Sequence, residues 1–153
     1  MATTSSVSGL AVGLRLAVTR TARRLRQEAG GGLSPTLAAA LATVERHGPL
    51  TPSELATRER VQRPTATKLI ARLEAEGLVA RTADPVDRRS SLIAASEAGR
   101  VLLADLRSRK DHYLEQRLRA LDAADRATLA RAADLLEHLL ADDPRGPAFR
   151  GPA

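Results

Sequence analysis

Cationic, amide and hydroxyl side chains gather at the start of one predicted helix, and these are the groups that recognise nucleic acid. Apolar residues at i, i+3, i+4 and i+7 predict an amphipathic helix that begins near Arg63 and ends at Gly77; they are Ala66, Leu69, Ile70 and Leu73. Its first turn and outer face carry the polar set that we expect to contact DNA: Gln62, Arg63, Pro64, Thr65, Thr67, Lys68 and Arg72. Glutamine pairs with adenine edges and arginine with guanine edges, which makes Gln62 and Arg63 the expected base readers. Threonine and lysine suit phosphates, and we expect that role for Thr65, Thr67 and Lys68.

A short helix before this one completes a DNA-binding motif. Thr51 suits the N-cap, Pro52 the first helical position, and Glu54 the third, which together form a capping box. The helix is expected to end near Glu59. Two helices joined by a short turn match the helix-turn-helix motif. An ordinary amphipathic surface helix would show the same periodicity, and the segment that follows favours the DNA-binding interpretation.

That segment predicts a pair of strands with a basic tip, here called the wing. Residues 78–82 and 90–95 have strand character, and the connection between them contains the turn former Asp84-Pro85. It is too long for a two-residue hairpin, so it is expected to protrude with Arg88 and Arg89 at its tip. Arginine at such a tip suits a narrow minor groove. We expect one of the two to enter it and the other to pair with Asp84 or Asp87 and stiffen the loop, and the sequence leaves open which does which. A merely solvated loop is the alternative.

These residues resemble the winged helix-turn-helix of the MarR family of bacterial transcriptional regulators. The run most similar to the family pattern is Asp84-Pro85-Val86-Asp87-Arg88-Arg89-Ser90, followed by Leu92-Ile93-Ala94-Ala95-Ser96-Glu97-Ala98-Gly99. The resemblance covers the chain from about Leu10 to Leu140. It implies a homodimer that binds a pseudo-palindromic double-stranded DNA operator, usually as a repressor, and that is often released by a small ligand or an oxidant.

The rest of the chain is predicted to be helical, giving a mainly α (α+β) fold. We divide it into a disordered start (1–6), an N-terminal dimerisation helix (7–33), a winged helix-turn-helix domain (34–95, wing 78–95), C-terminal dimerisation helices (96–141) and a flexible tail (142–153). The helices on either side of the winged domain cannot all bury their leucine stripes against it, so a monomer would expose an apolar patch. The resemblance assigns these helices to the dimer interface.

Composition narrows the functional classes. Lysine and arginine number 24 against 18 acidic residues, and the net charge of +6 favours a polyanionic partner. Cysteine is absent from the sequence, which excludes disulfides, thiolate metal sites and the cysteine-based oxidant sensing found in part of the family. There is no Gly-rich phosphate loop, nucleophile elbow or histidine pair at i, i+4, so we expect neither an enzyme nor a cofactor or metal site. No transmembrane-length apolar run or signal peptide is visible, so a cytoplasmic location is expected.

A small-molecule effector is the least defined partner. The resemblance places it between the dimerisation helices and the winged domain, where Arg15 or His47 could meet an acidic group. The only aromatic residues are Tyr113 and Phe149, so there is little to stack against a phenolic ring. Two other classes remain open: a winged-helix protein-interaction module, and a ligand sensor without sequence-specific DNA binding. The basic outer face of the predicted recognition helix argues against the first.

Overall fold

The protein is described by a computed structural model that covers residues 6–87 and 90–141. The predicted tail (142–153) and all but Ser6 of the predicted disordered start lie outside the described residues. The elements in chain order are α1 (Val7–Ala29), α2 (Pro35–His47), α3 (Pro52–Glu59), α4 (Arg63–Ala75), β1 (Val79–Ala83), β2 (Ser91–Ala95), α5 (Glu97–Arg119) and α6 (Ala123–Ala141).

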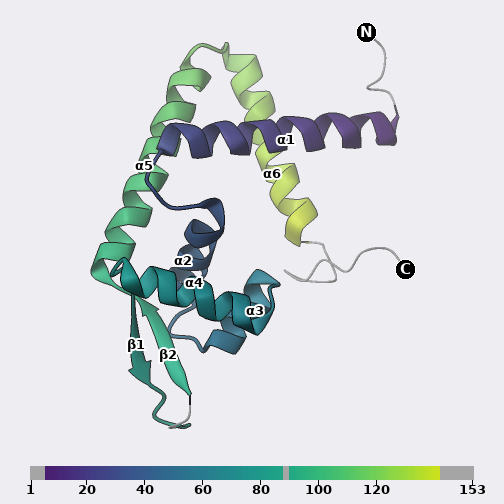
Figure 1. Ribbon diagram of the computed structural model, residues 1–153. Coiled ribbons are helices and arrows are strands. Elements are labelled where there is room, and N and C mark those ends of the chain that lie inside the picture. The colour runs from purple at the N-terminus through teal and green to yellow at the C-terminus, as the bar shows by residue number, and fades with distance from the viewer. Residues whose placement is uncertain (1–5, 88–89, 142–153) are drawn as a thin grey trace.

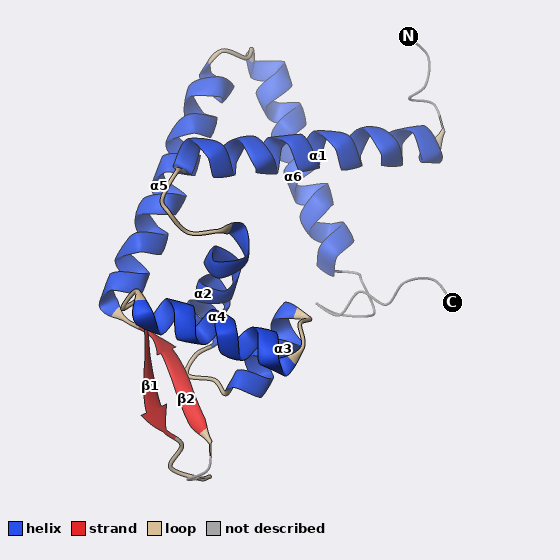
Figure 2. Cartoon of the chain, viewed as in Figure 1, coloured by secondary structure: helices blue, strands red, loops and turns tan. Residues whose placement is uncertain are grey.

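The elements form a small lobe from which long helices extend (Figure 1). Helices α2, α3 and α4 and the antiparallel pair β1–β2 make up the lobe, with the two strands projecting from it (Figure 2). Helix α5 runs away from the lobe, packs against α1 and turns into α6. This arrangement confirms the predicted mainly α (α+β) winged helix-turn-helix fold.

The hydrophobic core lies inside the lobe, where it fixes the orientation of α4. Fully buried side chains come from four of its five elements: Leu41 and Val44 of α2, Leu55 of α3, Ile70 and Leu73 of α4, and Ile93 of β2. Each such burial contributes about 1.5–3 kcal/mol. Leu50, just before α3, forms a single bridge with Ile93, with N–H to carbonyl distances of 3.0 and 2.8 Å. The polar face of α4 is therefore held outward by a packed inner face.

The strands begin one residue later than predicted, because the end of α4 uses the intervening backbone. The Leu78 N–H donates to the Leu73 carbonyl at 2.9 Å and closes the helix, with Gly77 at φ +70°. Leu78 therefore belongs to the helix terminus, and pairing starts with Val79 opposite Ala95.

Serine and threonine caps begin α1, α2, α3 and α5, and the cap predicted at Thr51 is one of them. Both halves of the capping box at α3 form: the Glu54 N–H donates to Thr51 Oγ1 at 3.2 Å, and the Thr51 N–H donates to Glu54 Oε2 at 2.7 Å. The hydrogen bond from the Thr51 N–H, followed by one from the Thr51 hydroxyl to Glu54 Oε2 at 2.8 Å, lowers the pKa of the Glu54 carboxyl because both stabilise its ionised form.

Removing this cap is expected to weaken the lobe. Thr51→Ala should lower the free energy of unfolding by about 0.5–2 kcal/mol, because it leaves the Glu54 N–H without its cap. Urea denaturation would measure the change. Ser53→Ala, two residues further along the same exposed turn, is the matched control and should change little. Equal losses in both variants would show that the capping box contributes nothing of its own.

Candidate nucleic-acid interface

The start of α4 presents the predicted base readers to solvent. Ala66, Ile70 and Leu73 are buried against the core, and this places the whole predicted set on exposed positions: Gln62, Arg63, Pro64, Thr65, Thr67, Lys68 and Arg72. Gln62 occupies the N-cap but makes no side-chain capping hydrogen bond, so its amide is available for another partner. Neither Arg63 nor Lys68 forms an ion pair within the described part of the chain. The structure thus brings an amide and two uncompensated cations together on one helical end.

Two members of the set have partners within their own helix. The Thr67 hydroxyl donates to the Arg63 carbonyl at 3.0 Å, so it would have to rotate before it could donate to a phosphate. Arg72 pairs with Glu76 at 3.1 Å, with 70% of its side chain exposed. Exposed i, i+4 pairs are weak, so Arg72 can exchange this partner for a phosphate at little cost.

The described part of the wing is shaped by backbone and Asp84 contacts. Asp84 Oδ1 accepts a hydrogen bond from the Val86 N–H at 2.8 Å, and the Ser90 N–H donates to the Asp87 carbonyl at 2.8 Å. Asp84 therefore orders the turn through its own neighbouring backbone. Arg88 and Arg89 lie outside the described residues, so their minor-groove contact and their pairing with Asp84 or Asp87 stay predictions.

A second charged contact, absent from our sequence predictions, joins α4 to both strands of the wing. The Arg81 guanidinium donates from Nε to Glu74 Oε1 at 3.1 Å and from Nη2 to Oε2 at 3.0 Å. Its Nη1 also donates to Ser91 Oγ at 2.8 Å. Hydrogen bonding to Arg81 lowers the pKa of Glu74, and the same contact raises the pKa of Arg81. A signal for the pair exists in the sequence: Glu74 follows buried Ile70 by one helical turn, so it borders the inward face.

A further bidentate pair joins the lobe to α5. The Arg107 guanidinium binds both carboxylate oxygens of Glu45 on α2, with Nη1 to Oε1 at 3.1 Å. This hydrogen bonding lowers the pKa of Glu45. Nearby, Arg109 Nη1 donates to the Ala29 carbonyl at the end of α1 at 3.3 Å. These contacts tie the orientation of the lobe to the long helices.

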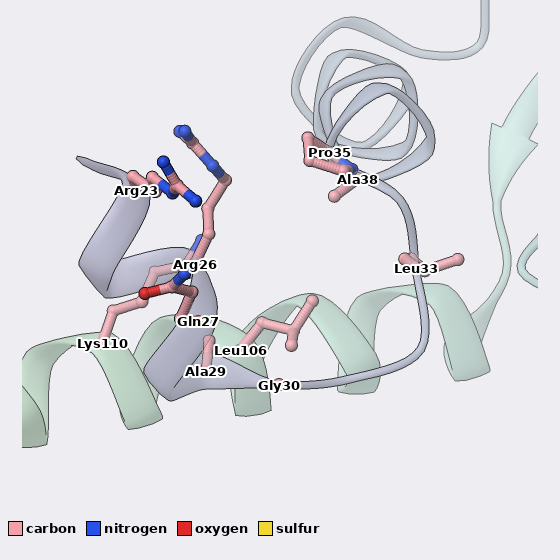
Figure 3. A pocket seen from close by; sticks show the side chains of 10 residues that line it. All are labelled: Arg23, Arg26, Gln27, Ala29, Gly30, Leu33, Pro35, Ala38, Leu106 and Lys110. Carbon is pink, nitrogen blue, oxygen red and sulfur yellow. The ribbon is translucent and has the colours of Figure 1, made fainter. Parts of the chain in front are cut away.

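A cavity of about 400 Å³ lies where α1, α2 and α5 meet (Figure 3). Arg23, Arg26 and Lys110 supply its cationic lining, with Pro35 and Ala38 on the opposite side. It lies between the long helices and the lobe, the region expected for an effector, and it meets the middle of α5. Neither predicted pocket residue lines it. Arg15 is eight residues before Arg23, about 12 Å along α1, and His47 lines a separate groove between α2 and α3.

Metal and membrane sites can be considered only for the residues that the structure describes. Among residues 6–87 and 90–141, no three histidine, cysteine or acidic side chains are grouped so that they could hold a metal ion. Over the same ranges, no helix combines the length and the apolar character needed to cross a membrane.

Comparison with known proteins agrees with this geometry. A model of the MarR family matches residues 33–91, which span the lobe and most of the wing. An HTH-type transcriptional regulator of Mycobacterium tuberculosis is 38% identical over 136 residues, spanning 88% of this chain and 95% of that protein. The chain belongs to the MarR family. The family's members are DNA-binding transcriptional regulators, so this chain is a helix-turn-helix transcriptional regulator and not an enzyme, as the sequence predicted.

Solved structures of MarR-family proteins and other regulators share the fold. A Pseudomonas aeruginosa protein described as a transcriptional regulator is 36% identical, with a TM-score of 0.77 over 85% of this chain and 92% of that one. A MarR family protein from Bacillus stearothermophilus has a TM-score of 0.76 at 23% identity, over 89% and 96% of the two chains. A Staphylococcus aureus MepR variant, solved bound to an oligodeoxyribonucleotide, has a TM-score of 0.67 at 19% identity, over 85% and 97%. The last two likenesses concern the fold alone.

Proposed function

We propose that this MarR-family chain is a homodimeric repressor that binds a pseudo-palindromic operator and is released by a small-molecule effector. The observation that carries the proposal is the exposed N-terminal end of α4, where Gln62, Arg63 and Lys68 have no ion-pair or capping role in the described structure. Unpaired donors at the start of a recognition helix suit base edges and phosphates in a major groove. The wing beside it supplies a second element for the adjacent minor groove.

The apolar surface of the long helices supports the dimer. Helix α6 buries none of its residues, and four of its five leucines stay exposed: Leu129 by 47%, Leu135 by 53%, Leu139 by 68% and Leu140 by 72%. Helix α1 adds exposed Val7, Leu10 and Val12. Apolar stripes of this size call for a partner, and a second copy in a two-fold arrangement would cover them. Two recognition helices would then lie about 34 Å apart, one turn of DNA.

The cavity between α1, α2 and α5 supports effector control. Its three cations, Arg23, Arg26 and Lys110, suit an acidic ligand in place of the Arg15 or His47 contact expected from sequence. A ligand that fits one spacing of the lobes better than another would shift the population toward that spacing. Release from the operator would follow if that spacing did not match the half-sites.

A mobility-shift titration tests the core of the proposal. The probe is the DNA upstream of the protein's own gene, with excess nonspecific competitor at about 150 mM salt, because salt sets the nonspecific background. A discrete band that survives competitor is expected. If neither this probe nor genome-wide selection of bound fragments yields a specific site, sequence-specific binding is wrong, and the protein-interaction alternative takes its place.

The wing arginines make a separate prediction. Replacing Arg88 and Arg89 by alanine together should weaken operator binding and reduce the slope of log K against log salt by about one for each phosphate that the wing no longer neutralises. The double variant Arg117→Ala/Arg119→Ala, at the far end of α5, removes the same charge and is the control. A slope that does not differ from the control would rule the wing tip out as a DNA contact.

A further inference from the structure

We infer that Glu74, Arg81 and Ser91 form a clamp that positions the wing relative to recognition helix α4. With the wing in this position, α4 and the wing can contact the same stretch of DNA at the same time. The inference rests on the proposed DNA binding and names positioning residues for it. Both elements must reach the same stretch of DNA, α4 in the major groove and the wing in the adjacent minor groove. The angle between them therefore decides whether they can bind together.

The clamp lies on the inner face of the wing. Side chains alternate along a strand, so Arg81 shares a face with buried Val79, and Ser91 shares one with buried Ile93. That face packs toward α4. Arg81 is paired in register with Ile93, which makes Ser91 its diagonal neighbour, within reach of a long side chain. One guanidinium thus holds both strands and the helix.

The clamp holds the wing further from its root than the buried contacts do. Closer to the root, Ser96 Oγ donates to the Gly77 carbonyl at 2.6 Å, and Val79, Ile93 and Ala95 are buried. Beyond Arg81, the Asp84 N–H donates to the Ser90 carbonyl at 3.3 Å and joins the two sides of the wing. A two-stranded hairpin is only marginally stable by itself, so the wing depends on contacts such as the clamp that join it to the lobe.

The Arg81–Glu74 contact differs from the exposed Arg72–Glu76 pair in side-chain exposure and in geometry. Side-chain exposure is 38% for Arg81 and 31% for Glu74, against 70% for Arg72 in its pair with Glu76. The pair is bidentate, and the planar guanidinium of Arg81 fixes the orientation of the Glu74 carboxylate as well as its distance. Hydrogen bonding within the clamp lowers the pKa of Glu74, which keeps the carboxylate charged. A lysine at position 81 could keep the charge but could not hold three acceptors in this geometry.

The test compares two substitutions that remove the same charge from the same helix. Glu74→Gln should weaken operator binding about fivefold relative to Glu76→Gln, as expected when one coupled interaction is removed. Arg81→Lys, which keeps the net charge, should reproduce the loss. Amide hydrogen exchange should speed up at residues 82, 83, 91 and 92 in Glu74→Gln but not in Glu76→Gln. Urea denaturation establishes that each variant is folded under the assay conditions.

A double-mutant cycle separates positioning from general destabilisation. In a background that lacks Arg88 and Arg89, Glu74→Gln should cause no further loss, because the wing that it positions no longer contributes. A full loss in that background, or equal binding and exchange in Glu74→Gln and Glu76→Gln, would overturn the clamp. Wild-type protein that shows no operator preference would instead refute the proposed function. The exchange measurement would still decide whether the clamp holds the wing.

Discussion

Gly99→Ala is expected to lower the free energy of unfolding by about 1–3 kcal/mol, as overpacking does, although alanine is the better helix former. Gly99 is buried in the first turn of α5, and a Cβ there would overlap the Leu78 carbonyl oxygen. It would also lie 3.1 Å from the Leu78 carbonyl carbon and 3.2 Å from Leu41 Cδ1. The Leu78 carbonyl is fixed by the Ser96 N–H at 3.0 Å, so backbone must move.

Urea denaturation would measure this loss. The matched control is Ala98→Leu, an exposed position in the same helical turn, where the change should stay within about 0.5 kcal/mol. Because the displaced segment links α4, the wing and α5, operator affinity should fall together with stability. A Gly99→Ala protein as stable as the wild type would mean that α5 does not approach the root of the wing as closely as described.

Arg63→Ala is expected to remove most of the operator preference. A bidentate arginine–guanine contact discriminates by about 1–3 kcal/mol, and a two-fold symmetric operator contains it twice. The loss for the dimer should therefore be about 2–6 kcal/mol, with preference relaxed at one position of each half-site. Binding to random DNA should change much less, because Arg63 is expected to read a base and not a phosphate.

Lys68→Ala is the comparison at another exposed position of the same helix. It should weaken operator and random DNA alike and reduce the salt slope by about one, since a phosphate contact carries no sequence information. Binding titrations of both protein variants on the operator, on operators changed at single positions and on random DNA would distinguish base reading from phosphate contact. Equal losses on operator and random DNA for Arg63→Ala would contradict its base-reading role.

Local sequence signals predicted the elements because each depends on neighbouring residues. The caps Ser34, Thr51 and Ser96 start helices by hydrogen bonds three residues along the chain. The stripe of Ala66, Ile70 and Leu73 determines which face of α4 is buried, and so which residues are exposed to solvent. The family resemblance, carried by the wing motif and Ser96–Gly99, was confirmed by sequence comparison. The roles of individual DNA-contact residues stay predictions.

The effector contacts predicted for Arg15 and His47 stay predictions, and the cavity between α1, α2 and α5 lies away from both residues. Arg15 and His47 were chosen for their charge and their position on the predicted helices, but a cavity is defined by how helices cross. The end of α1, the start of α2 and the middle of α5 meet instead, and they contribute Arg23, Arg26 and Lys110. Crossing points depend on packing across long separations, which periodicity does not encode.

By itself, the sequence determined the helical fold, the positions of the helix-turn-helix and the wing, and the polar face of α4, because these follow from caps, turns and periodicity within a few residues. Tertiary structure alone decided which charges meet. Arg81 reaches Glu74 across seven residues, and Arg107 reaches Glu45 across sixty-two. The chain is rich in arginine, and sequence spacing alone would allow each arginine to pair with several different carboxylates. Only the packing of β1 on α4, and of α5 on α2, selects the partner that sets the angle of the wing and the orientation of the lobe.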